Sequence, residues 1–182
     1  MQPSNEDRLS TIGRAMTLGV ASGLRSQVPL MLLAHAAKRG EFAVGAEPPL
    51  GWLRSRRLRQ ALDLSAVGEM IGDKLPFVPK RTDPAPLLGR IVIGALAGAA
   101  LLADGRQPWL DGAIAGAAGG AAGTFGGRYA RAMLVAWTGL PDPVVALVED
   151  GLAIGIGLVA LRRNGSGAIP AGAPSPDVQP AG

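Results

Sequence analysis

Four acidic residues lie within apolar stretches of this sequence, where an ionised carboxylate is costly to keep away from water. Glu69 and Asp73 belong to the stretch GEMIGDKLP, and Lys74 follows them directly. Glu149 and Asp150 belong to a later apolar stretch. On a helix, two acids four residues apart share one face. Such a pair attracts a cation, a proton or an arginine side chain from elsewhere in the chain.

Two interpretations of these acids stay open. In the first, the carboxylates line a polar path through a membrane, and a carboxylate with a raised pKa couples proton movement to substrate movement. In the second, the acids pair with arginines such as Arg25 and Arg128 and fix the register of the helices. The polar site expected under the first interpretation comprises Glu69, Asp73, Lys74, Glu149, Asp150, Arg25, Gln27, Arg128 and Asp142.

Any metal ion at this site would be held by oxygen atoms. Its ligands would be the four acids Glu69, Asp73, Glu149 and Asp150. Oxygen ligands suit Mg²⁺, Ca²⁺ or Mn²⁺ better than zinc, and the chain offers no cysteine and a single histidine, His35. The residues do not determine whether a metal binds.

Motifs of enzymes and cofactor sites are missing from the sequence. The glycine-rich stretch GAAGGAAGTFGG lacks the GK[ST] ending and the preceding strand of a phosphate-binding loop. The sequence has no GxSxG motif, and no His–Asp partnership accompanies Ser22, Ser26 or Ser65. We therefore expect neither an enzyme nor a bound cofactor.

The composition is typical of a membrane protein. Hydrophobic residues make up 48% and charged residues 18% of the 182 residues, and 27 are glycines, which let membrane helices approach closely. The net charge of +4 is interpreted as the basic bias of cytoplasmic loops, because no basic helix interleaved with aromatic residues indicates a nucleic-acid partner. We expect a multi-pass protein of the inner (plasma) membrane.

Five apolar segments follow one another, and four or five of them are expected to act as membrane helices. They cover residues 11–37, 58 or 62 to 75, 87–103, 108–137 and 144–161. The predicted fold is an all-α, polytopic membrane helix bundle. A polar, frayed N-terminal segment (1–10) precedes the membrane domain (11–163), and a disordered tail (164–182) follows it.

The first segment contains a proline that is expected to interrupt it. Pro29 lacks an N–H donor and leaves the carbonyl group of Arg25 without its helical partner. A freed carbonyl inside a membrane must meet protein, water or an ion. We therefore predict a kink or a break near Ser26.

The region 38–60 is predicted to be a loop with a basic cluster. The cluster comprises Arg54, Arg56, Arg57 and Arg59. The favoured interpretation is the positive-inside signal of a cytoplasmic loop, and the alternative is a patch for anionic lipid headgroups beside Trp52. Together with the basic end at Arg162 and Arg163, the loop predicts an outer N-terminus and an inner C-terminus.

Two parts of the chain resemble each other. Residues 11–76 and 108–163 each contain a GxxxG motif with an arginine nearby, followed by an acid, an apolar run and a glutamate, around a linking helix at 84–103. With one helix between them, the second copy would run in the opposite direction, as in many secondary transporters. Chance recurrence of Gly, Ala and Arg is the alternative. The glycine-rich faces also predict a homo-oligomer.

Three stretches carry a family resemblance. They are GLRSQVPLMLLA at 23–34, GEMIGDKLPFVPKRTDPAPLLGRIVIGALAGAAL at 68–101 and GLPDPVVALVEDGLAIGIG at 139–157. Together they resemble the bacterial membrane family catalogued as domain of unknown function 4126, over residues 12–161. This resemblance implies a small multi-pass membrane protein, and it implies no activity.

A weaker similarity is to cation/proton exchangers, whose two inverted repeats each carry E-x-G-D-[KR]-[ST]. Here EMIGDKL at 69–75 has one extra residue and lacks the final hydroxyl, and EDG at 149–151 lacks the basic residue. The similarity favours transport over a purely structural set of ion pairs.

We therefore expect a small transporter or channel that moves an ion or a small solute, a cation among them, through the polar site. The alternative is a non-transporting membrane protein that binds anionic lipid or a partner membrane complex. The transporter interpretation requires the acids to converge on one water-filled cavity. The lipid bilayer is the expected partner under both interpretations.

Overall fold

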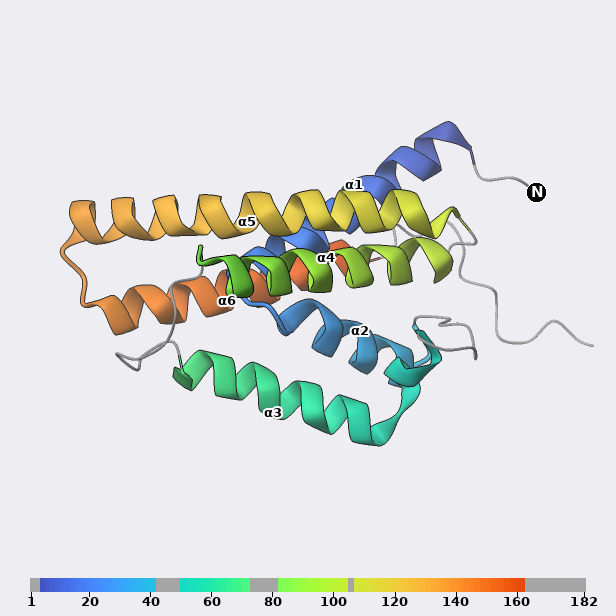
Figure 1. Ribbon diagram of the computed structural model, residues 1–182, viewed down its shortest axis with the longest axis horizontal. Helices are drawn as coiled ribbons and strands as arrows, with labels where there is room; N and C mark the ends of the chain where they lie inside the picture. Colours follow the sequence, from blue (N-terminus) through green and yellow to red (C-terminus); the bar gives the residue numbers. More distant parts are fainter. Residues whose placement is uncertain (1–3, 42–49, 73–81, 105–106, 163–182) are drawn as a thin grey trace, which may run out of the picture.

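The computed structural model describes residues 4–41, 50–72, 82–104 and 107–162, and within these residues the chain is all-α (Figure 1). The elements are α1 (Asn5–Leu24), α2 (Val28–Lys38), the 3-10 helix η1 (Leu50–Arg54), α3 (Arg56–Gly72), α4 (Pro84–Asp104), α5 (Trp109–Thr138) and α6 (Asp142–Leu161). The prediction of an all-α fold is confirmed. The region 38–60, predicted to be a loop, instead contains η1 and the first turn of α3.

Residues of the polar N-terminal segment (1–10) already belong to α1. The Ser4 hydroxyl accepts a hydrogen bond from the Asp7 N–H (3.1 Å), and the Asp7 carboxylate accepts one from the Ser4 N–H (3.3 Å). This capping box satisfies N–H groups that a helix start otherwise leaves without partners. The helix therefore begins at Asn5 rather than near Thr11. The tail at 164–182 lies outside the described residues.

Glycines hold α1, α4 and α5 together with their backbones in contact. A Cβ atom on Gly19 would collide with the carbonyl of Gly116, and a Cβ atom on Gly116 would collide with the carbonyl of Gly94. Gly98 and Gly112 form a further contact of this kind between α4 and α5. The glycine faces predicted to join copies of the chain are thus used inside one copy.

The chain reverses direction between α1 and α2, which the sequence did not predict. α1 runs antiparallel to α6, because Arg14 donates a hydrogen bond to the carbonyl of Ala160 while Arg25 pairs with Asp150. α2 then returns toward the end from which α1 came, and successive helices alternate in direction up to α6 (Figure 1). The start of α1 and the end of α6 therefore lie at the same end of the bundle, and the outer N-terminus and inner C-terminus expected from the basic residues stay a prediction.

The helix directions give no support to an inverted repeat of 11–76 and 108–163. α1 and α5 would be equivalent helices of opposite direction, yet they run parallel, with Gly19 beside Gly116 and Gly23 beside Thr124. The break after α1 also has no counterpart in α5, which is continuous over 30 residues.

Among the helices of the described residues, two are long and apolar enough to cross a membrane, judged by length and composition. They are α4 and the Pro143–Leu161 part of α6, and the apolar α2 is shorter. Large apolar side chains are exposed on the outer faces of several helices. These include Leu64, Val67 and Ile71 on α3, Leu88, Val92 and Leu96 on α4, Ile114, Met133 and Trp137 on α5, and Leu147, Leu152 and Val159 on α6.

The glycine contacts predict that a glycine-to-alanine substitution lowers stability at a packed position of α5 and not at an open one. Gly116→Ala should lower the free energy of unfolding by about 1–3 kcal/mol, because the added Cβ meets the backbone of Gly94 and forces α4 and α5 apart. Thermal unfolding of the purified protein measures the change. Gly126→Ala is the matched control on α5, since a Cβ there meets no atom within 4 Å. Equal destabilisation by both variants would contradict the packing.

Candidate functional site

The break between α1 and α2 is the centre of the site. α1 ends at Leu24, Arg25 is extended (φ −139°, ψ 109°), and Pro29 lies in the first turn of α2. The Arg25 carbonyl accepts a hydrogen bond from the Val28 N–H (3.3 Å), so the group freed by the proline is satisfied by a tight turn. The predicted break near Ser26 is confirmed.

Glu69 on α3 caps the start of α2. Its carboxylate accepts hydrogen bonds from the backbone N–H groups of Ser26 (3.0 Å) and Gln27 (3.3 Å), while no side chain of the N-cap residue does so. The same carboxylate accepts a hydrogen bond from Arg90 on α4 (3.1 Å). A negative charge at a helix N-terminus is favoured by the helix dipole and by charge-assisted hydrogen bonds. Glu69 therefore stabilises the break and ties three helices together.

Arg25 is fully buried and pairs with Asp150 on α6. Its Nε donates to Asp150 Oδ1, and Asp150 is only 7% exposed. A buried guanidinium is tolerated because a carboxylate compensates its charge. This ion pair holds the start of the break against α6.

Ser22 and Arg90 complete the group that surrounds the break. The Ser22 hydroxyl donates to the Arg90 carbonyl (2.8 Å), which joins α1 to α4, and both side chains are buried. We call the side chains of Ser22, Arg25, Glu69, Arg90 and Asp150 the break-point cluster. Its two arginines and two acids cancel in formal charge.

Glu149 pairs with a helix that contributes no side chain to the break-point cluster. Its carboxylate accepts a hydrogen bond from Arg131 on α5 (3.3 Å), and it is 6% exposed. Adjacent acids on a helix point about 100° apart, so Asp150 and Glu149 meet different helices. Of the four acids predicted to converge, the structure brings Glu69 and Asp150 to opposite sides of the break and places Glu149 in a separate ion pair.

The other predicted residues are placed as follows. Gln27 contributes its backbone N–H, and Arg128 is exposed and donates to the Thr82 hydroxyl (3.0 Å), away from the cluster. Asp142 is the first residue of α6, and its side chain is outside the described part. Asp73 and Lys74 also lie outside the described residues.

The basic cluster lies at the turn from η1 into α3. Its members were predicted as Arg54, Arg56, Arg57 and Arg59; the first three are exposed and the last is half-buried. These side chains form no ion pair with another residue in the described ranges. Trp52 is also exposed beside them.

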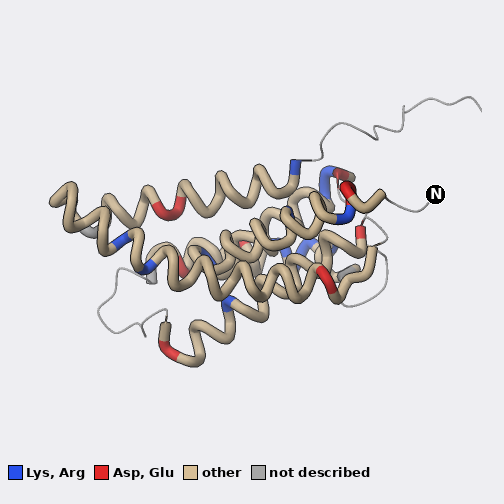
Figure 2. The backbone as a smooth tube through the Cα atoms, turned by 90° about the horizontal axis from the view of Figure 1, so that it is seen from above, with Lys and Arg blue, Asp and Glu red and all other residues tan. Residues whose placement is uncertain are grey.

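Sequence reasoning missed Arg90, Arg131 and Ser22. Arg90 carries the one charge inside the apolar segment 87–103, and a charge in such a segment is itself a sign of a buried partner. Arg131 lies one helical turn after Arg128, so the choice between these two arginines depended on which face of α5 meets α6. Figure 2 shows how few positions along the helices are charged.

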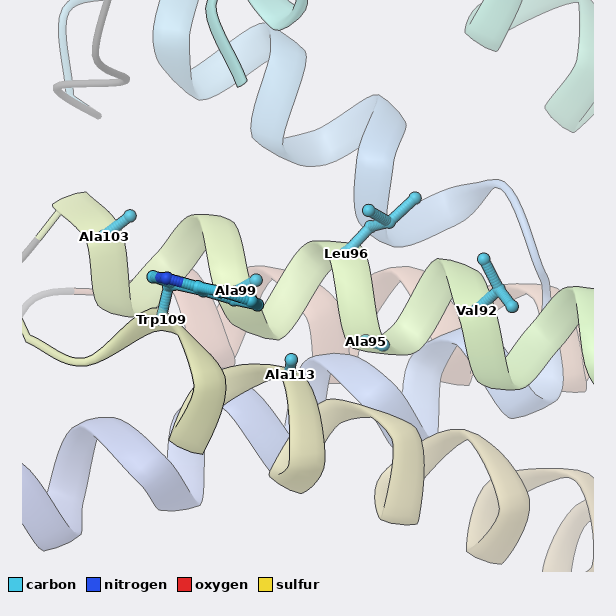
Figure 3. A pocket seen from close by; sticks show the side chains of 7 residues that line it. All are labelled: Val92, Ala95, Leu96, Ala99, Ala103, Trp109 and Ala113. Atoms are coloured by element: carbon cyan, nitrogen blue, oxygen red, sulfur yellow. The ribbon is translucent and has the colours of Figure 1, made fainter. Parts of the chain in front are cut away.

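Two pockets lie outside the break-point cluster. One, of about 110 Å³, lies between α5 and α6 and is lined by Leu24, Arg131 and Glu149 among others. The other, of about 500 Å³, is an apolar groove on α4 and α5 that includes Leu96 and Trp109 (Figure 3). Neither is lined by Glu69 or Asp150. Within the described ranges, no group of three or more His, Cys, Asp or Glu side chains could hold a metal ion.

The burial of Arg25 predicts a large cost when its partner is removed. Asp150→Asn should lower the free energy of unfolding by about 3–5 kcal/mol, because it breaks a buried ion pair by removing the carboxylate that accepts from the Arg25 guanidinium. The control is Asp111→Asn, which breaks the exposed pair with Arg8 and should cost less than about 1 kcal/mol. Thermal unfolding compares the two, and a cost for Asp150→Asn no larger than the control's would contradict the role of the pair.

Comparison with known proteins supplies a family. The family model described as domain of unknown function (DUF4126) matches residues 12–163. No curated protein and no solved structure matches the chain, and none of these comparisons connects it to cation/proton exchangers. The match covers most of the 182 residues and includes every member of the break-point cluster. The chain therefore belongs to the DUF4126 family.

Proposed function

We propose that the chain is a multi-pass membrane protein in which α3, α4, α5 and α6 cross the bilayer. α1 and α2 form a hairpin that enters the bundle and returns to the side from which it came. The alternating helix directions and the exposed apolar side chains of α3 to α6 support this arrangement. Soluble monomers rarely expose apolar patches of such extent.

The buried break favours a role in transport. Non-helical backbone at membrane depth is tolerated where it is enclosed by protein or lines a polar path, and discontinuous helices with charged termini form the binding sites of many transporters. Here the break holds a helix N-terminus, two buried arginines and two acids at one place. We propose that an ion or a small solute passes along the break-point cluster. The observation that supports this proposal is the gathering of these charged groups around a buried helix break.

A non-transporting membrane protein is the second candidate. The exposed basic cluster beside Trp52 favours it, because arginines next to an interfacial tryptophan suit anionic lipid headgroups. In that case the break-point cluster is a set of ion pairs that fixes the helix hairpin, and a partner complex or anionic lipid binds at the end of the bundle that carries η1.

The hairpin predicts that both described ends face the same side of the membrane. Because the chain has no cysteine, single Cys variants report the side directly. Ser10→Cys and Arg162→Cys should react with an impermeant maleimide from one side of sealed vesicles, and Leu140→Cys, at the turn between α5 and α6, from the other. Labelling of Ser10→Cys and Arg162→Cys from opposite sides would contradict the hairpin.

Flux through the protein should depend on the buried acids. In proteoliposomes screened with protons, cations and small anions, Glu69→Gln and Asp150→Asn should each reduce an active flux at least about tenfold, because each removes a negative charge from the break-point cluster. Asp63→Asn, at a half-exposed acid of α3, should leave flux unchanged. Absence of any flux together with co-purified anionic lipid would support the second candidate instead.

A further inference from the structure

α3 is attached differently at its two ends. Near its N-terminus Leu58 and Leu62 pack against the hydrophobic core that α1, α2 and α4 share, together with Leu53 of η1. Toward its C-terminus the outward side chains Val67 and Ile71 are exposed. Figure 1 shows α3 at the edge of the molecule, beside α2.

Glu69 carries the polar attachment of the C-terminal half of α3. This one carboxylate accepts three hydrogen bonds, two from the N–H groups of the two residues before α2 and one from Arg90 of α4. Its side chain is 14% exposed, and that of Arg90 is 6% exposed. The contact is therefore shielded from water, yet it depends on a single side chain at the edge of the bundle.

We propose that α3 is a gate and that the Glu69 carboxylate is its latch. The proposal rests on the proposed transport function and adds how that transport is regulated. In the closed state Glu69 holds α3 over the break. In the open state Glu69 is released, and the C-terminal half of α3 moves away while its packed N-terminal half stays in place. The closed and open states differ in the formal charge of the break-point cluster. With Glu69 in place the break-point cluster is formally neutral, and with Glu69 withdrawn it carries one net positive charge.

Release of the latch leaves specific groups without their acceptor. The N–H groups of Ser26 and Gln27 and the Arg90 guanidinium each lose a hydrogen bond to the carboxylate. Buried donors without acceptors are costly, so an intermediate position of Glu69 is disfavoured. The gate is thus either closed by the carboxylate or open with water or another acceptor in its place.

Paired spin labels test the gate. Ile71→Cys on α3 and Leu88→Cys on α4 are both exposed, and the natural chain contributes no cysteine. The full-length protein in detergent or nanodiscs should give one narrow distance distribution, and Glu69→Gln should add a population at longer distance. Asp63→Asn is the matched control on the same helix, because Asp63 faces His35 rather than the break. It should leave the distribution unchanged.

A second label pair separates gate opening from general unfolding. Leu96→Cys and Ile114→Cys report on the packing of α4 against α5 and should keep their distance in every variant. Formate should restore the short α3–α4 distance in Glu69→Ala, because its carboxylate can take the place of the missing one, whereas neutral formamide should not. Restoration that saturates with formate concentration identifies the carboxylate as the latch.

The gate is overturned if Glu69→Gln and Glu69→Ala both keep the narrow α3–α4 distance, or if the α4–α5 distance changes with it. The proposed function is judged separately by flux. Flux that depends on Glu69 without movement of α3 would keep transport and remove the gate, and movement of α3 in a protein without flux would keep the gate and remove transport.

Discussion

The peptide groups at the break between α1 and α2 impose the constraint around which the rest of the structure is organised. A helix that stops inside a bundle leaves N–H and C=O groups without partners, and burial makes these groups costly. Side chains from other helices gather at the break. Glu69 of α3 accepts hydrogen bonds from the backbone at the break and from Arg90 of α4, and Arg25 at the break pairs with Asp150 of α6. One local interruption therefore brings together α1, α2, α3, α4 and α6.

Features that depend on residues close together in the sequence could be predicted, and features that depend on how distant helices pack could not. The break itself was predictable, because the effect of Pro29 acts within one helical turn. That acids would meet arginines was also predictable from the cost of unpaired charge in an apolar environment. The identities of the partners were not, since the choice of Arg131 over Arg128 depends on how α5 is rotated against α6. Pro29 determines that the first helix stops, whereas the direction of α2 is determined by its packing against the other helices.

The glycines illustrate the same limit. Their density predicts close helix contacts, and such contacts are present, yet composition does not tell whether a glycine face meets its own chain or another copy. Here Gly19, Gly94 and Gly116 meet one another between α1, α4 and α5. The backbones of these three helices are in close contact, and α3 and α6 place the acids Glu69 and Asp150 beside them. Both candidate functions require these three packed helices. The two candidates differ in whether α3, at the edge of the molecule, moves.

The pairing of Arg25 with Asp150 has a consequence for the order of assembly. The two residues are separated by 125 positions, so the arginine is synthesised long before its counter-charge. In the proposed membrane arrangement, the Arg25 guanidinium is favoured at depth only once the last helix brings the carboxylate of Asp150 beside it. The last helix to be synthesised therefore completes the fold. A chain truncated before Asp150 would lack α6 and would also lose the ion pair that holds Arg25 at the end of α1.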